Sequence, residues 1–218
     1  MGLARFVVVG AIVLGVLPVP GGGLLLFAQA QKTTADAGAT TKPAPAHAKV
    51  SMAPFRAFIL RSKKLQDQGK LDLSKPRTLT VEGDRQEDGT LANVQITGAS
   101  ASDANFRRVA QDFVAALNES RVLQTLETVS RVRMTFGLDA QRFTVQSSSD
   151  TPSEARAEEM ARGYRMMLNL GRLAKRGTDE GAVLNGMKIS SSGKQLLMNL
   201  DVPREQMGNL LHRQITPN

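Results

Sequence analysis

The residue types that most often carry out catalysis or bind metal ions are sparse in this sequence. Its two histidines are His47, in a low-complexity stretch, and His212, near the C-terminal end, and neither belongs to a ligand spacing such as His-Glu-x-x-His. Cysteine is absent, which excludes disulfides, thiolate metal sites and thiol nucleophiles. We therefore expect no metal ion and no cofactor, and we expect both histidines at the surface.

Serine and lysine occur at the Ser-x-x-Lys spacing of penicillin-recognising enzymes at Ser191 and Lys194. That chemistry requires the pair on a helix, whereas here it lies in a predicted hairpin turn and no Ser-Asp-Asn or Lys-Thr-Gly sequence follows. The glutamates of residues 154–159 stand in the first turns of a predicted helix, where acidic side chains favour the positive end of the helix dipole. Glu158 also precedes Arg162 by four residues, which indicates a helical ion pair. Neither group predicts catalysis.

Two arginines form the best candidate for a binding face. Arg131 and Arg133 alternate with Val132 and Met134, so both arginines are expected on the solvent side of a strand. An RNA-binding sheet would place aromatic side chains between the basic residues, and here the alternation directs Phe136 to the buried side. We expect a protein-interaction face at Arg131 and Arg133, and we expect no nucleic acid.

The net charge of +8 is not spread evenly along the chain. Residues 31–70 hold eight lysines and arginines against two acidic residues, whereas residues 71–218 hold nineteen basic and eighteen acidic residues. The basic excess therefore belongs to the segment before the folded part. A nearly neutral folded part argues against a nucleic-acid partner, which would need a basic surface.

An uncharged stretch of 25 residues, residues 6–30, stands near the start of the chain. At about 1.5 Å per helical residue, it is long enough to cross the ~30 Å hydrocarbon layer of a membrane. Residues 1–30 are either a signal peptide, cleaved after Ala30, or an anchor kinked by the prolines and glycines of residues 18–23. The lysines that follow favour a cytoplasmic C-terminus by the positive-inside rule. We nevertheless expect export, with the chain anchored in the inner membrane and facing the periplasm, or secreted to the periplasm.

Two segments of different character follow. Residues 31–54 are rich in alanine, threonine and proline with scattered lysines, which is the composition of a linker. Residues 55–70 place Phe55, Phe58 and Ile59 at helical spacing among arginines and lysines, and they predict a short amphipathic helix. Such a helix lies either on anionic lipid beside the N-terminal segment or against the edge of the folded domain.

Residues 71–215 repeat one pattern three times: two strands of alternating apolar residues joined by a turn, and then a one-sided helix. We expect an α+β fold in which three strand-strand-helix units form one antiparallel sheet of about six strands with helices on one face. The alternative is a series of small subdomains, but a lone hairpin with one helix would be marginal by itself, which favours one continuous sheet. The repeated pattern is weakest at residues 176–185, which connect the second helix to the third hairpin. The predicted turns are Asp88-Gly89, Asp139-Ala140 and Ser192-Gly193. The predicted helix starts are Ser102, Thr151-Pro152-Ser153-Glu154 and Pro203.

A family resemblance rests on the first unit and the strand after it. The segments that show the resemblance are the hairpin LTVEGDRQEDGTLANVQITG, the connection at residues 100–103, the helix through Phe106 and Leu117, and the strand near residues 132–138. About residues 71–149 thus resemble the C-terminal domains of the TonB and TolA energy-transducing proteins, and the spacer with KPAPAHAK is similar too. The resemblance implies an inner-membrane anchor, a spacer crossing the periplasm, and a small domain that takes a partner strand onto its sheet edge. It does not extend to residues 150–215, an additional helix and hairpin-helix unit.

Together these patterns predict a non-enzymatic protein of the cell envelope, an interaction protein or a TonB-like transducer or adaptor. The expected partners are other envelope proteins and, through the N-terminal segment, the membrane; no small-molecule substrate is evident. Two alternatives stay open: an exported enzyme with a dispersed site of serine, lysine and carboxylates, or a structural repeat protein with no dedicated ligand. A pocket with converging carboxylates or a Ser-Lys pair would favour the enzyme.

Overall fold

The computed structural model of this chain describes residues 50–215, so the predicted signal peptide or anchor and most of the linker lie outside the described residues. In chain order the described elements are α2 (Ala53–Asp67), β1 (Arg77–Arg85), β2 (Leu91–Thr97), α3 (Ala104–Ser120), the 3-10 helix η2 (Val122–Thr125), β3 (Arg131–Leu138), β4 (Arg142–Asp150), α4 (Glu154–Ala174), α5 (Asp179–Asn185), β5 (Met187–Ser192), β6 (Gln195–Pro203) and α6 (Arg204–Ile215).

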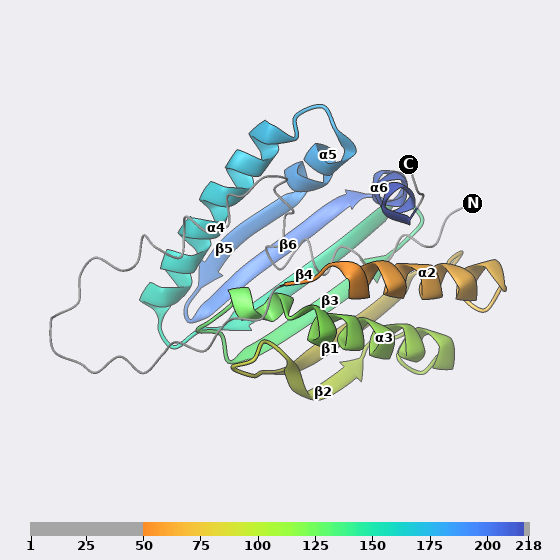
Figure 1. The fold of residues 1–218 in the computed structure, drawn as a ribbon, viewed down its shortest axis with the longest axis horizontal. Helices are drawn as coiled ribbons and strands as arrows, with labels where there is room; N and C mark the ends of the chain where they lie inside the picture. Colours follow the sequence, from red (N-terminus) through yellow and green to blue (C-terminus); the bar gives the residue numbers. More distant parts are fainter. Residues whose placement is uncertain (1–49, 216–218) are drawn as a thin grey trace, which may run out of the picture.

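All six strands form one antiparallel sheet in the order β2-β1-β3-β4-β6-β5 (Figure 1). Each repeat contributes one hairpin, β1 with β2, β3 with β4, and β5 with β6. The pairings of β1 with β3 and of β4 with β6 join the three hairpins edge to edge. The expected α+β fold of three strand-strand-helix units is confirmed.

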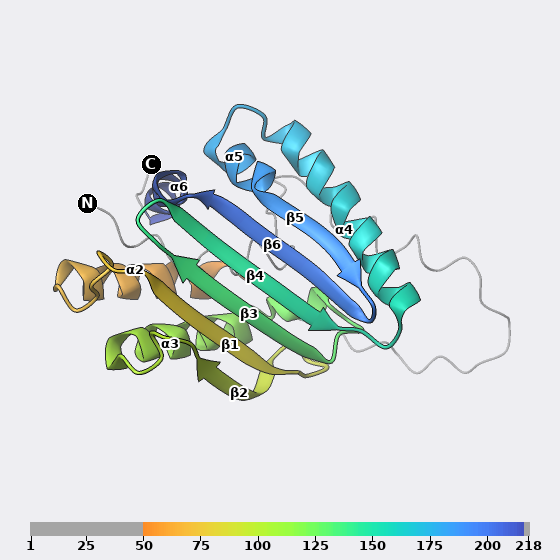
Figure 2. The same cartoon turned by 180° about the vertical axis from the view of Figure 1, so that it is seen from behind.

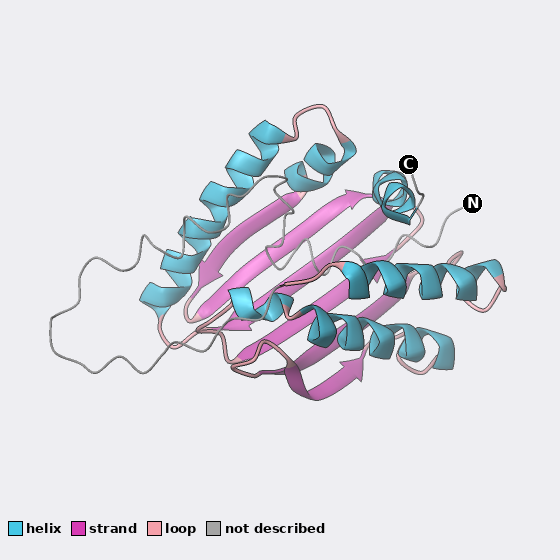
Figure 3. Cartoon of the chain, viewed as in Figure 1, coloured by secondary structure: helices cyan, strands magenta, loops and turns pink. Residues whose placement is uncertain are grey.

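The helices cover one face of this sheet. They stand in front of the strands in Figure 1, and the strands are seen in front of them after the half-turn of Figure 2. Helix α4 flanks the outer strand β5 (Figure 1), and Figure 3 shows the same view coloured by secondary structure. Strand β3 explains this arrangement, because its residues alternate between buried and exposed. Val132, Met134 and Phe136 are buried, whereas Arg131 and Arg133 are exposed. Side chains that alternate with a period of two give the sheet one apolar face, which must be covered.

Phe113 of α3 lies where α2, α3 and the sheet meet. Its ring centroid is 6.2 Å from that of Phe55, 6.0 Å from that of Phe58 and 5.2 Å from that of Phe136, the last in an edge-on arrangement. Phe55, Phe58 and Ile59 of α2 are at most 1% exposed. The helix predicted over residues 55–70 therefore packs on the domain. The lipid-surface alternative is wrong, since these apolar side chains are already covered.

Two helices begin slightly later than the sequence predicts. The cap of α3 is Asp103, not Ser102, and its carboxylate accepts hydrogen bonds from two backbone N–H groups of the first turn. The cap of α4 is Ser153, not Thr151, whose hydroxyl donates instead to the carbonyls of Ser153 and Lys194. Neighbouring residues of capping type compete in both places, and the one that caps has an extended backbone.

The joint at residues 176–185 contains a helix that the sequence did not predict. This helix, α5, is seven residues long, and the hydroxyl of Thr178 caps it by accepting a hydrogen bond from the Gly181 N–H at 3.1 Å. Seven residues make about two turns, which is too short for a clear apolar period.

The predicted Asp88-Gly89 turn is fixed against the C-terminal end of α3. The Asp88 carboxylate accepts hydrogen bonds from the Thr90 N–H at 3.0 Å and hydroxyl at 2.6 Å, and it forms an ion pair with Arg121. Gly89 has φ 77°, and a Cβ atom there would lie 2.7 Å from the backbone nitrogen of Gln124. The turn therefore requires glycine both for its backbone conformation and for this close approach.

Replacing Phe113 by alanine tests how far the domain depends on this aromatic contact. We expect Phe113→Ala to lower the free energy of unfolding by about 3–5 kcal/mol, because it opens a cavity between three elements. Urea unfolding followed by circular dichroism measures the change. Arg108→Ala, an exposed change on the same helix, is the matched control and should cost less than about 0.5 kcal/mol. Equal stability of the two variants would contradict the packing described.

Asp88 should make the stability depend on acid. Hydrogen bonds from the Thr90 side chain and backbone, and then the Arg121 side chain, lower the pKa of Asp88 to about 2. Because this pKa lies below the unfolded value of about 3.9, the ionised carboxylate stabilises the fold above pH 4, and this contribution is lost as the pH falls from about 4 to 2. Asp88→Asn keeps an acceptor for Thr90 but not the charge. The difference in urea midpoint between the unsubstituted protein and Asp88→Asn should become smaller as the pH falls from about 4 to 2. A difference that stays constant over this range would contradict a lowered pKa of Asp88.

Candidate binding face

The face of the sheet opposite the helices is covered by no described element (Figure 2). We call it the open face. Strand register and burial assign it these residues: Thr78, Thr80, Glu82 and Asp84 of β1; Ala92, Gln95 and Thr97 of β2; Arg131, Arg133, Thr135 and Gly137 of β3; Arg142, Thr144, Gln146, Ser148 and Asp150 of β4; Lys188, Ser190 and Ser192 of β5; and Gln195, Leu197, Asn199, Asp201 and Pro203 of β6.

Arg131 and Arg133 lie on the open face, where their alternation places them, and Glu82 of β1 binds both. Nη2 of Arg131 is 2.7 Å from Oε1 of Glu82. Nη2 and Nε of Arg133 are 2.5 Å and 2.6 Å from Oε2 of the same glutamate. The register produces this contact, because Glu82 stands opposite Arg133 and Asp84 opposite Arg131. The Glu82 side chain is only 15% exposed, whereas those of Arg131 and Arg133 are 50% and 60% exposed. The two guanidinium groups thus stay accessible while sharing one carboxylate.

The open face as a whole carries no net charge. Its acidic residues are Glu82, Asp84, Asp150 and Asp201, and its basic residues are Arg131, Arg133, Arg142 and Lys188. Arg142 and Asp201 pair with each other at 2.6 Å. A strongly anionic partner such as nucleic acid gains little from such a surface.

A row of uncharged polar side chains crosses the middle of the open face. It is in register over the six strands, in the order Thr97, Thr80, Thr135, Gln146, Asn199 and finally the basic Lys188. The hydroxyls of Thr80 and Thr135 are 3.0 Å apart. Among the open-face residues none is aromatic, and Leu197 has the one large apolar side chain. The surface therefore offers many hydrogen-bonding groups and no stacking platform.

The two outer strands of the sheet differ in how their edges are covered. Helix α4 packs along β5. At β2, the side chain of Asn118 accepts from the Leu91 N–H at 2.8 Å and donates to its carbonyl at 3.3 Å. A register shift opposite β1 and the left-handed Asn93, with φ 50°, bend the same end of the strand. Bulges and caps prevent an edge from pairing. Strand addition of the kind that the TonB and TolA resemblance implies would have residues 95–97 available.

The residues that could act in catalysis are not brought together. Ser191 is half-buried on β5 and Lys194 is exposed in the turn after it, where its carbonyl accepts from the Thr151 N–H. Glu158 and Arg162 form the expected helical ion pair, at 3.3 Å. His47 lies outside the described residues. Within residues 50–215 no three residues among histidine, aspartate and glutamate are grouped as a metal site would require.

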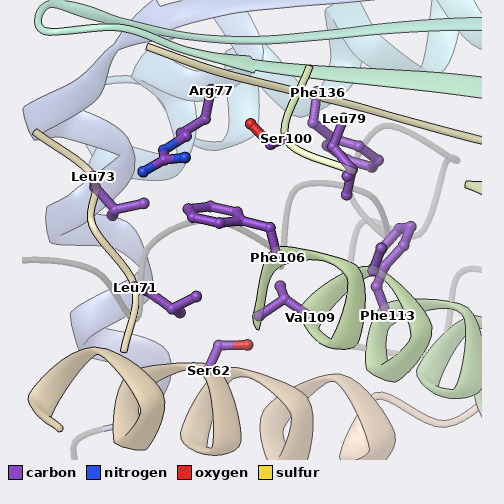
Figure 4. Close-up of a pocket in the computed structure, with 11 residues that line it drawn as sticks. Ser62, Leu71, Leu73, Arg77, Leu79, Ser100, Phe106, Val109, Phe113 and Phe136 are labelled. Atoms are coloured by element: carbon purple, nitrogen blue, oxygen red, sulfur yellow. The ribbon is translucent and has the colours of Figure 1, made fainter. Parts of the chain in front are cut away.

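A small cavity of about 50 Å³ lies between α2, α3 and β1 (Figure 4). Its lining is apolar apart from Ser62, Ser100 and Arg77, whose guanidinium stacks 4.4 Å from the centroid of the Phe106 ring and donates to the Asp72 carbonyl. A space of this size holds a few water molecules at most. It contains neither the converging carboxylates nor the Ser-Lys pair that would favour the enzyme alternative.

Sequence reasoning found the two arginines but missed Glu82. The signal for it is nonlocal, since Glu82 and Arg133 are 51 positions apart and meet only because β1 pairs with β3. The alternation around Val81 did place Glu82 on the solvent side of its strand. Combined with the strand order, this would have been sufficient to find the pair.

The Arg131–Glu82–Arg133 cluster should be measurable as a salt-dependent contribution to stability. We expect Glu82→Gln to lower the free energy of unfolding by about 1 kcal/mol, because two guanidinium groups lose their shared carboxylate. The loss should shrink between about 0.01 M and 1 M NaCl, since salt screens both the lost attraction and the remaining repulsion. Glu119→Gln, an exposed change on α3, is the control and should show neither effect. A loss for Glu82→Gln that does not depend on salt would contradict an electrostatic role.

No family model, no curated protein and no solved structure matches this chain. No helix within residues 50–215 is both long and apolar enough to cross a membrane. The likeness to TonB and TolA domains, the envelope location and the protein partner therefore remain predictions from the sequence.

Proposed function

We propose that this chain is a non-enzymatic protein of the cell envelope that binds another protein on the open face of its sheet. The observation that carries the proposal is the face itself: six paired strands whose polar side is covered by no described element. An antiparallel sheet often has one face in water, but a face of this size is also a preformed surface whose residues the strand ladders hold in register.

The size of the open face suits a protein partner. Six strands spaced about 4.8 Å apart, with about eight residues each at roughly 3.3 Å per residue, give a face of roughly 700 Å². A stable protein–protein interface buries about 800 Å² on each partner, so this face and its rim would supply most of one side.

The chemistry of the open face suits a polar and nearly neutral partner surface. Threonine, serine, glutamine and asparagine side chains provide hydrogen bonds, while charges of both signs fix the orientation of a complementary surface. Arg131 and Arg133 stand out because their side chains are at least half exposed and Glu82 holds them in place. Arginine held in this way loses little conformational entropy when it binds, and it is enriched at interface hot spots.

The envelope location comes from the sequence. Residues 6–30 form a 25-residue uncharged stretch, which a spacer separates from the domain, whether that stretch stays as an anchor or is cleaved after Ala30. An adaptor or transducer role, as in the TonB and TolA proteins, fits the same order of segments.

Photo-crosslinking from the open face tests the binding proposal. A crosslinking amino acid at Gln146 or at Asn199, in the full chain and in its native cell, should give the same discrete adduct with one envelope protein. Adding Arg131→Ala and Arg133→Ala should reduce the yield of this adduct about tenfold or more, because two hot-spot arginines are worth over 1 kcal/mol each.

The control is the same crosslinker at Glu119, which is exposed on α3 behind the sheet. It should give no such adduct. An adduct that forms equally from Glu119, or one that does not depend on the two arginines, would contradict binding on the open face. Cell fractionation with N-terminal sequencing tests the location, and an intact Met1 in a soluble cytosolic fraction would refute it.

A further inference from the structure

Helix α4 exposes a stripe of large apolar side chains that the fold does not use. Met166, Leu170 and Leu173 are 53%, 55% and 72% exposed, and Met167 beside them is 38% exposed. Their spacings of four and three residues place Met166, Leu170 and Leu173 within roughly 60° of one another around the helix. The opposite side already packs on the sheet, where Leu168 is 5% exposed. Apolar side chains gathered on a surface in this way indicate a contact site.

Polar contacts fix α4 in this orientation. Arg172 donates from Nε to the Leu184 carbonyl at 3.0 Å and from Nη2 to the Met187 carbonyl at 2.6 Å. The Tyr164 hydroxyl donates to the Thr125 carbonyl at 3.0 Å. Turning the helix to bury the stripe would break these bonds and leave their carbonyls without donors, so the exposure of the stripe is part of the folded structure.

The same half of the helix is strongly basic. Residues 160–178 contain no acidic residue and five basic ones: Arg162, Arg165, Arg172, Lys175 and Arg176. Arg162 pairs with Glu158, and Arg172 holds the carbonyls just described. The nearest acids on the other side are Asp179, which pairs with Arg213 at 2.7 Å, and Glu180. Arg165 and Arg176 form no ion pair among the described residues, so cationic groups adjoin the apolar stripe.

We propose that α4 docks on the surface of an anionic lipid bilayer. The stripe of Met166, Leu170 and Leu173 enters the boundary between headgroups and acyl chains, and the arginines and Lys175 bind lipid phosphates. A helix with an exposed apolar side and a basic flank has the chemistry of interfacial membrane binding. A convex helix also needs no complementary groove in a bilayer, whereas a protein partner would have to provide one.

The chain outside the described residues makes this contact reachable. A spacer of 19 residues, residues 31–49, separates the uncharged stretch from the first described residue. At no more than about 3.4 Å per residue it reaches roughly 65 Å, which is ample for the domain to return to a membrane that holds residues 6–30. The inference does not rest on a protein partner at the open face, and the two are tested separately.

Because the chain contains no cysteine, one cysteine introduced at Leu170 can be labelled alone. The full chain carrying Leu170→Cys and an environment-sensitive fluorophore is reconstituted in two kinds of vesicle, pure phosphatidylcholine and phosphatidylcholine with 30% phosphatidylglycerol. We expect the label to move into an apolar environment only in the anionic vesicles. Its emission should then shift to the blue, and an aqueous quencher should no longer reach it. The same label at Arg108→Cys on α3 should stay in water in both.

Removing the flanking charges should release the helix. Arg165→Gln with Arg176→Gln should lower the ratio of docked to undocked label at residue 170 about fivefold for each charge removed, and 0.5 M salt should have a similar effect. Because both side chains are exposed and unpaired, thermal unfolding should not change. Docking that is insensitive to these changes would refute the electrostatic part of the proposal.

Two outcomes would overturn the proposal outright. A label at residue 170 that stays in water in anionic vesicles, while the chain is bound to them, would show that α4 does not meet the bilayer. Equal shielding of the label in pure phosphatidylcholine would show that anionic lipid is not what covers the stripe, and loss of this shielding when the chain is diluted in lipid would assign the cover to a second copy.

Discussion

The burial of one face of a six-stranded sheet beneath its helices is the constraint on which the rest of this structure depends. Side chains in a strand alternate, so shifting β3 by one residue would expose Val132 and Met134 and bury Arg131 and Arg133 without partners. That cost, several kcal/mol for each buried unpaired charge, fixes the register. The composition of the open face, and the meeting of Glu82 with both arginines, are consequences of packing on the opposite side.

Local signals in the sequence were sufficient for the six described strands and for the described helices other than α5 and η2, and nonlocal pairing decided the rest. Alternation predicted the strands, the three-fold repeat predicted three hairpins, and the helix caps were misplaced by one or two residues because neighbouring residues compete for the cap. Neither the order of the strands nor the contact of Glu82 with Arg133 could be predicted, since no local rule selects which hairpin edge joins which. The amphipathic pattern of residues 55–70 is compatible with a lipid surface and with a protein core, and the burial of Phe55 and Phe58 beside Phe113 separates the two.

The candidate surfaces of this domain differ in chemistry, and the difference follows from their positions. The open face is polar and neutral, because its acidic and basic residues are equal in number and the register places Glu82, Asp84 and Asp150 opposite the two arginines of β3. Helix α4 packs on the sheet with one side only, and Arg165 of its exposed part and Arg176 just after it form no ion pair among the described residues. A neutral polar face selects partners by shape and hydrogen bonds, whereas a basic apolar stripe responds to the charge of a whole surface.

These positions also make the two proposed contacts compatible. Helix α4 flanks the β5 edge, and β2 forms the opposite edge of the sheet (Figures 1 and 2). Because the exposed stripe lies on the side of α4 opposite its contact with the sheet, a bilayer against it would leave the open face uncovered. Docking through one rigid helix would hold that face at a fixed orientation to the membrane. Binding to a second, membrane-bound partner would then cost less orientational entropy, so lipid contact at α4 would strengthen protein contact at the open face without any change in its structure.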